Sequence, residues 1–160
     1  MTPTTFPFIK RDFLETLQIN IGYKCNQACS HCHVNAGPNR KEMMSEEIIK
    51  IIPKVIEANN IKVLDITGGA PELHPKFKQL ITDVKSLGVQ IIDRCNLTIL
   101  TEPGYKDMAN FLASNKVNII ASLPCYIKDN VDEQRGVGVF EKSIKALKTL
   151  NAFGYGIENN

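Results

Sequence analysis

The sequence lacks three features that would each point to a particular class of protein. It has no run approaching roughly 18 apolar residues, which excludes an obvious membrane-spanning helix. Its first thirteen residues lack the charged-then-apolar layout of a signal peptide, so we expect a cytoplasmic protein without a membrane partner. No block of basic residues accompanies the net charge of +2, which argues against a nucleic-acid partner.

No long low-complexity segment interrupts the chain, and 43% of its residues are hydrophobic while 22% are charged. These proportions are typical of a soluble globular protein. At 160 residues the chain has the size of one ordinary domain, and we expect residues 1–160 to share one core.

Apolar patterns that alternate between strand and helix periods predict an α/β fold. We expect strands at about 17–21, 61–66, 89–92 and 117–123, and helices at about 45–56, 75–87, 103–114 and 140–150. The last three strands begin 28 residues apart, as repeated strand–helix units would. Pro53 is expected to kink or shorten the first helix, because its ring removes a backbone donor.

This order predicts parallel strands in a partial (βα) barrel of about four βα units, half of a complete eightfold barrel. The chain therefore looks truncated. The fourth strand is expected at an open edge of the sheet, and unpaired edges favour self-association.

Five cysteines are an odd number, and three of them lie within eight positions at Cys25, Cys29 and Cys32. This crowding suits metal ligation better than a set of disulfides. A structural zinc site needs four protein ligands, and the fourth would have to come from His31, His33, Cys95 or Cys125. Three cysteines instead suit an iron–sulfur cluster with one open iron. The spacing favours the cluster and leaves zinc as the alternative.

Two motifs in this order resemble those of a known family. Cys-x3-Cys-x2-Cys after a first strand is similar to the signature of the radical S-adenosylmethionine (SAM) superfamily, and Gly68-Gly69-Ala70-Pro71 after the second strand resembles its glycine motif. The resemblance implies an enzyme with the N-terminal part of the family's core, whose later barrel units and Cys-rich region are absent. It also implies a 4Fe–4S cluster on the three cysteines, SAM on the open iron, and a reductant such as flavodoxin or ferredoxin. Cleavage of SAM would yield a 5′-deoxyadenosyl radical.

The same resemblance implies a set of cofactor contacts. His31 would lie beside adenine, although a solvated loop histidine is an equal alternative. Ala70 stands where many members have Glu, so backbone groups would serve SAM there, and the glycine pair alone could be a simple turn. The expected cofactor-binding residues are His31, Gly68, Gly69, Ala70, Pro71, Asn96 and Ser122.

Cys95 and Cys125 each follow a predicted strand and are expected at the same rim of the barrel, where they could act in catalysis. The alternative is that each is a small buried hydrophobic residue.

The blocks DRCNLT and SLPCY, followed by Gln134-Arg135-Gly136, are similar to the radical SAM/Cys-rich branch. That branch includes arsenosugar-biosynthesis enzymes, which implies a methylated arsenic compound as small-molecule substrate. A peptide-modifying enzyme and a non-catalytic, metal-stapled binding module remain the alternatives.

Overall fold

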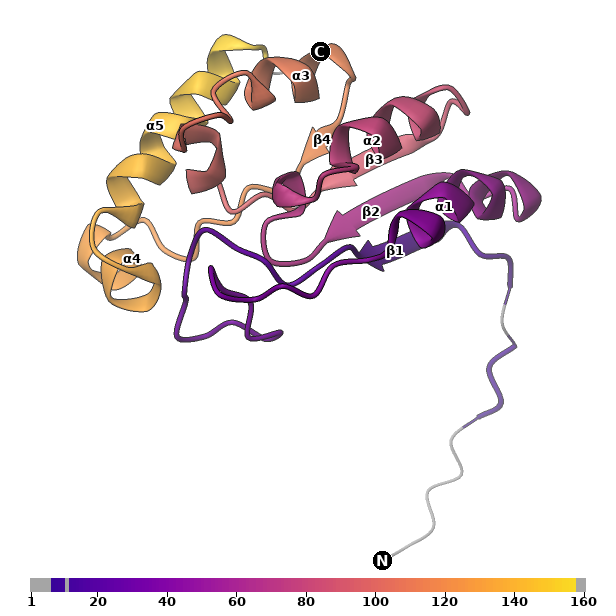
Figure 1. Cartoon of the computed structure of the whole chain (residues 1–160), viewed down its shortest axis with the longest axis horizontal. Coiled ribbons are helices and arrows are strands. Elements are labelled where there is room, and N and C mark those ends of the chain that lie inside the picture. The colour runs from indigo at the N-terminus through magenta and orange to yellow at the C-terminus, as the bar shows by residue number, and fades with distance from the viewer. Residues whose placement is uncertain (1–6, 11, 158–160) are drawn as a thin grey trace, which may run out of the picture.

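The computed structural model describes residues 7–10 and 12–157 (Figure 1). Four strands form one sheet in the order β1-β2-β3-β4, and every pairing is parallel. The strands are β1 (Thr16–Asn20), β2 (Val63–Thr67), β3 (Gln90–Asp93) and β4 (Asn118–Ile119). The predicted α/β fold with four parallel strands is confirmed.

Five helices and two single turns of 3-10 helix accompany the strands, and the last two helices follow β4. They are α1 (Glu46–Ala58), η1 (Pro71–Leu73), α2 (Phe77–Lys85), η2 (Thr98–Thr101), α3 (Met108–Ser114), α4 (Lys128–Arg135) and α5 (Val139–Ala152). Helices α1 and α2 lie beside one another over the sheet, and α5 runs along α3 and contacts η2 (Figure 1). The described part of the chain has no helix with the length and apolar character needed to cross a membrane.

Helix α1 illustrates why these segments form where they do. The Ser45 hydroxyl caps its start by accepting a hydrogen bond from the Ile48 N–H at 3.4 Å, and Glu46 and Glu47 place negative charge in the first turn. Its buried stripe consists of Ile49, Ile52 and Ile56. Contrary to the prediction, the helix is not shortened at Pro53 but continues to Ala58.

The core lies between the sheet and these helices. Leu64 and Ile66 of β2 are fully buried, as are Leu80, Ile81 and Val84 of α2. Three consecutive residues of β2 are buried, so both of its faces are covered, which accounts for its largely apolar sequence.

The predicted fourth strand, 117–123, is longer than the two residues of β4. Backbone pairing nevertheless continues past its end, because Ile120 N–H donates to Asp93 O and Ser122 N–H donates to Cys95 O, both at 2.9 Å. The parallel register brings Asn20, Thr67, Asp93 and Ile119 to the same edge. The loops that leave these four ends therefore converge, which determines where a site can form.

Three polar side chains, from β1, from β2 and from the residue after β3, are linked to one another by hydrogen bonds. The Arg94 guanidinium donates two hydrogen bonds of 2.8 Å to the Asp65 carboxylate, and the Gln18 amide donates a third of the same length. The hydrogen bonds from Arg94, which are the largest cause, hold the pKa of Asp65 below its usual value of 3.8. Arg94 thus pairs with a carboxylate of its own chain.

We predict that Asp65→Asn lowers the free energy of unfolding by about 1 kcal/mol near neutral pH, because a part-buried ion pair is lost and solvent at the half-exposed Arg94 screens it. The folded-state pKa is depressed, so this contribution is present above pH 3.8 and disappears as the pH falls through the folded-state value. Urea denaturation followed by circular dichroism at several pH values measures the difference. Asp12→Asn, at an exposed residue, is the control. A deficit independent of pH would contradict the ion-pair origin.

Candidate cluster and cofactor site

The loop that carries the three cysteines is held by main-chain pairing close to Cys25. Tyr23 N–H donates to Glu42 O at 2.9 Å, Gly37 N–H donates to Tyr23 O at 3.0 Å, and Cys25 N–H donates to Gly37 O at 3.1 Å. The segment that precedes the cysteines therefore continues the direction of β1, and its backbone is hydrogen-bonded to Gly37 and Glu42. This backbone fixes Cys25 without help from a ligand.

The glycine turn after β2 supports the same loop from the other side. Gly69 N–H donates to Gly22 O and Ala70 N–H donates to Lys24 O, each at 2.9 Å. A Cβ atom on Gly69 would lie 2.4 Å from Lys24 O, and one on Gly68 would lie 2.6 Å from Gly22 O. Gly68 also has φ +152°. The two glycines are thus required by the close approach of two backbones, whether or not a cofactor binds.

We predict that Gly69→Ala lowers the free energy of unfolding by about 1–3 kcal/mol, because the backbone of Lys24 cannot move away easily. The variant should also take up less iron, since the Cys25 segment must shift. Gly37→Ala is the matched control, because a Cβ there meets nothing within 4 Å. Urea denaturation and iron content after anaerobic reconstitution are the measurements. Equal behaviour of the two variants would contradict the close-packing argument.

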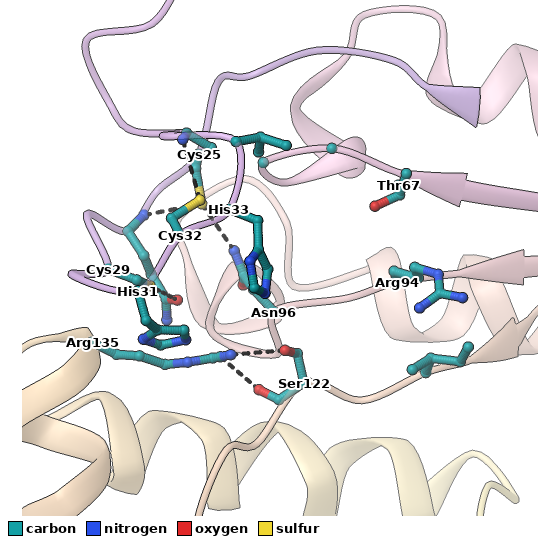
Figure 2. A pocket seen from close by; sticks show the side chains of 16 residues that line it. Cys25, Cys29, His31, Cys32, His33, Thr67, Arg94, Asn96, Ser122 and Arg135 are labelled. Carbon is teal, nitrogen blue, oxygen red and sulfur yellow. Dashed lines mark hydrogen bonds between the residues drawn. The ribbon is translucent and has the colours of Figure 1, made fainter. Parts of the chain in front are cut away.

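A cavity of about 370 Å³ opens beside this loop (Figure 2). All three clustered cysteines line it, and residues from the ends of β2, β3 and β4 form the other walls. Eight of the residues predicted to bind metal or cofactor lie on its wall: Cys25, Cys29, His31, Cys32, Gly68, Gly69, Asn96 and Ser122. Segments separated by up to about a hundred positions in the chain thus meet around one space.

Two predicted cofactor-binding residues lie elsewhere. Ala70 and Pro71 do not line the cavity and are buried beneath it. The Ala70 N–H is already bonded to Lys24 O, and Pro71 begins the turn η1. Their backbone holds the cysteine loop and does not face the space that a cofactor would occupy.

The three sulfur atoms are spaced more widely than one metal ion requires. A tetrahedral zinc ion with Zn–S bonds of about 2.3 Å holds its sulfurs roughly 3.8 Å apart. The described residues contain one group of metal-binding side chains whose donor atoms all lie within 4.8 Å, and Cys25, Cys29 and Cys32 are not part of it. At least one pair of the three cysteine sulfurs therefore lies more than 4.8 Å apart, a separation that a cluster of several irons can span.

Hydrogen bonds already point at the sulfurs. The Cys25 sulfur accepts from Gln27 N–H and from the Asn96 amide, both at 3.4 Å, and the Cys32 sulfur accepts from Ala36 N–H at 3.2 Å. Burial raises the pKa of the Cys25 thiol, while the two hydrogen bonds oppose this rise. Such donors stabilise negative charge on sulfur when it is bound to iron.

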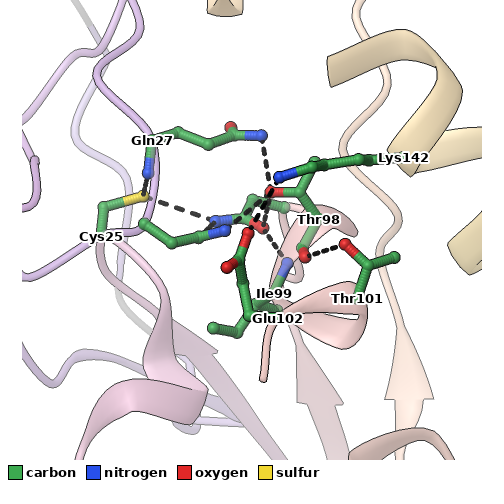
Figure 3. Close-up of polar contacts among 9 residues, drawn as sticks. Cys25, Gln27, Thr98, Ile99, Thr101, Glu102 and Lys142 are labelled. Atoms are coloured by element: carbon green, nitrogen blue, oxygen red, sulfur yellow. Dashed lines mark hydrogen bonds and ion pairs between the residues drawn. The ribbon is translucent and has the colours of Figure 1, made fainter. Parts of the chain in front are cut away.

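A polar network joins the end of β3 to the cysteine loop (Figure 3). Besides Cys25, the Asn96 amide donates to Asn26 Oδ1 at 2.8 Å, and the Thr98 hydroxyl oxygen accepts from Gln27 at 2.8 Å and Asn26 at 2.9 Å. Asn96 therefore positions a cysteine as well as lining the cavity. Gln27 and Thr98 were not predicted, although Gln27 lies within the cysteine motif and Thr98 within the block DRCNLT, because neither motif specifies the residue type at these positions.

The far wall of the cavity carries a positive charge that the sequence did not reveal. Arg135, at the end of α4, donates to Ser122 O at 2.6 Å and to Ser122 Oγ at 2.7 Å (Figure 2). Its Nε is buried without a partner. Burial raises the pKa of the Cys29 thiol, and the positive charge of Arg135 lowers it. Helix α4 has weak apolar periodicity, so the sequence signal for it was confined to Gln134-Arg135-Gly136.

Cys95 does not reach the rim at which it was predicted. Side chains alternate along β3 and its extension, so Arg94 and Asn96 face the cavity while Asp93 and Cys95 face the opposite side. Cys95 is fully buried, as its alternative interpretation expected. Cys125 is partly exposed and accepts from Ile127 N–H at 3.4 Å. Neither thiol lines the cavity, so the structure does not bring the expected pair together there.

Comparison with known proteins agrees with this geometry. The model of the family described as "Radical SAM superfamily" matches residues 19–159. The chain belongs to the radical SAM superfamily. A "Probable GTP 3′,8-cyclase" of Saccharolobus solfataricus is 28% identical over 141 residues, which cover 85% of this chain and 43% of that protein. Radical SAM proteins are enzymes that use a 4Fe–4S cluster and SAM, and act on small molecules or peptides with the help of reductants.

Solved structures show the same fold. SuiB of Streptococcus suis bound to S-adenosylmethionine superposes with a TM-score of 0.72 at 20% identity, covering 89% of this chain and 32% of that one. SuiB bound to the precursor peptide SuiA gives 0.73 at 20% identity, with 89% and 31% covered. The chain thus spans less than half the length of the proteins that it matches.

Proposed function

We propose that this chain binds a 4Fe–4S cluster through Cys25, Cys29 and Cys32 and binds SAM in the adjoining cavity. The observation that carries the proposal is the convergence of three cysteines, supported by backbone and amide donors, on one face of that cavity. When bound, such a cluster with one open iron supplies the electron that cleaves SAM to methionine and a 5′-deoxyadenosyl radical. That electron would come from a reductant such as flavodoxin or ferredoxin.

The residues of the chain have separable tasks in this proposal. Gln27, Ala36 and Asn96 stabilise the cysteine sulfurs by hydrogen bonding, and Asn96 ties the loop to β3. Gly68 and Gly69 hold the loop by close backbone contact and leave the wall there free of side chains. His31 and Ser122 lie on the wall where a nucleoside would contact them.

Arg135 would recognise the carboxylate of SAM. Its guanidinium lies on the cavity wall, Ser122 fixes its orientation, and no described residue forms a salt bridge with it. A charge-assisted hydrogen bond in a partly enclosed site contributes more than one exposed to water.

We expect anaerobic reconstitution to load about four irons per chain and to give an EPR signal of the reduced protein that SAM perturbs. Cys29→Ala should abolish both, whereas Cys125→Ala, at a cysteine outside the cavity, should leave them unchanged. Failure to load iron, with no response to SAM and with bound zinc lost in Cys29→Ala, would instead assign the loop to a metal-stapled binding module. Equal loss of iron in both variants would contradict the assignment of ligands.

We expect Arg135→Gln to weaken SAM binding to the cluster-loaded protein about tenfold, which corresponds to roughly 1.4 kcal/mol. Equilibrium dialysis with labelled SAM under anaerobic conditions measures the affinity. Lys142→Gln is the control, because this exposed cation pairs with Glu102 away from the cavity. Iron content must be equal in both variants, so that a change in affinity is not a change in loading. Unchanged affinity would remove Arg135 from the site.

The comparisons support the superfamily and not the arsenosugar branch. The arsenic hypothesis came from the resemblance of the DRCNLT and SLPCY blocks to that branch, and the relatives found do not belong to it by name. The two thiols that could have held trivalent arsenic, Cys95 and Cys125, do not line the cavity. The relatives named above include a GTP 3′,8-cyclase and a protein crystallised with a precursor peptide. The names of these proteins point to different substrates, so the fold does not identify the substrate of this chain. We therefore propose only cluster binding and SAM cleavage.

A further inference from the structure

Three side chains that the proposed SAM chemistry does not use meet behind the sheet. Glu72 lies in η1, Asp93 ends β3, and Cys95 follows two positions later. One donor atom from each lies within 4.8 Å of the other two. Glu72 is 3% exposed, and Asp93 and Cys95 are completely buried.

The charges of this group have no partner in the described part of the chain. All four carboxylate oxygens of Glu72 and Asp93 are buried and accept no hydrogen bond from any described residue outside this group. Within the group, the Glu72 side chain is in hydrogen-bond reach of Cys95 and Asp93. None of the salt bridges formed by the described residues includes either carboxylate. Two adjacent unpaired carboxylates in a protein interior are very costly, so the group needs a cation or retained protons.

The donor set identifies the kind of cation. A thiolate is a soft ligand that calcium and magnesium do not favour, whereas zinc accepts sulfur and carboxylate oxygen together. Zinc bonds of about 2.0–2.3 Å place neighbouring ligand atoms roughly 3.3–3.8 Å apart, within reach of atoms that already lie close together. A second carboxylate oxygen or a water completes four-coordination.

We propose that Glu72, Asp93 and Cys95 bind one zinc ion at a site separate from the iron–sulfur cluster. The ion links the turn after Gly69 to the end of β3, the two segments that support the cysteine loop. Its role is structural, because the strand alternation that puts Arg94 and Asn96 in the cavity directs these donors to the opposite side. The proposal does not depend on the assignment of the SAM site.

The alternative is that protons alone neutralise the group. Burial and the neighbouring carboxylate raise the pKa of Asp93 well above its usual value. Burial also raises the pKa of the Cys95 thiol well above its usual value. A carboxyl pair that shares a proton would bind no metal. The two accounts therefore differ in metal content.

The experiment measures zinc in a protein that cannot hold the iron cluster. The Cys25→Ala/Cys29→Ala/Cys32→Ala variant is purified, its fold is checked by circular dichroism, and its metals are measured by mass spectrometry. We expect about one zinc per chain, and a sulfur-to-cobalt charge-transfer band after growth with Co²⁺. Adding Cys95→Ser should remove the band, whereas adding Cys125→Ser should not.

A folded triple variant with neither stoichiometric zinc nor the cobalt band would overturn the proposal in favour of the proton-sharing pair. If the triple variant does not fold, X-ray absorption of zinc in the iron-free wild-type protein decides the question. One sulfur with two or three oxygen neighbours supports the proposed ligands. A shell of sulfurs only, or no zinc, rejects them.

Discussion

The site depends on the main-chain contact between the cysteine loop and the glycine turn. Two hydrogen bonds of 2.9 Å, from Gly69 N–H to Gly22 O and from Ala70 N–H to Lys24 O, carry the pairing of β1 and β2 beyond the ends of both strands. The contact is so close that a methyl group on Gly69 would overlap a carbonyl. This backbone pairing places Cys25 at the cavity, and the Asn96 side chain adds a hydrogen bond to its sulfur.

Much of this could be predicted from the sequence. Strand and helix periods gave the order of the parallel units, because buried strands and amphipathic helices leave strong apolar patterns. Eight of the predicted metal- or cofactor-binding residues line one cavity, because the carboxyl ends of parallel strands converge at one edge. The sequence did not reveal which of Arg94, Cys95 and Asn96 face the cavity. Their side chains alternate along one extended segment, so Arg94 and Asn96 line the cavity and Cys95 does not.

Other features lay outside what local patterns can report. Helix α4 has little apolar periodicity, so neither the helix nor the orientation of Arg135 toward Ser122 was expected. The meeting of Glu72 with Asp93 and Cys95 is a tertiary contact between the turn η1 and the end of β3, and no spacing rule links these residues. The length of β4 was overestimated, since apolar residues continued after its regular pairing ended.

The link between Ser30 and Gln134 has a consequence for the order of events during synthesis. The Ser30 N–H donates to Gln134 O at 3.0 Å, and the two residues are 104 positions apart. At a synthesis rate of about 5–20 residues per second, the cysteines emerge from the ribosome roughly 5–20 s before this last wall of the cavity. During that interval the cysteine loop lacks its hydrogen bond to Gln134, and the cavity lacks the wall that Arg135 forms.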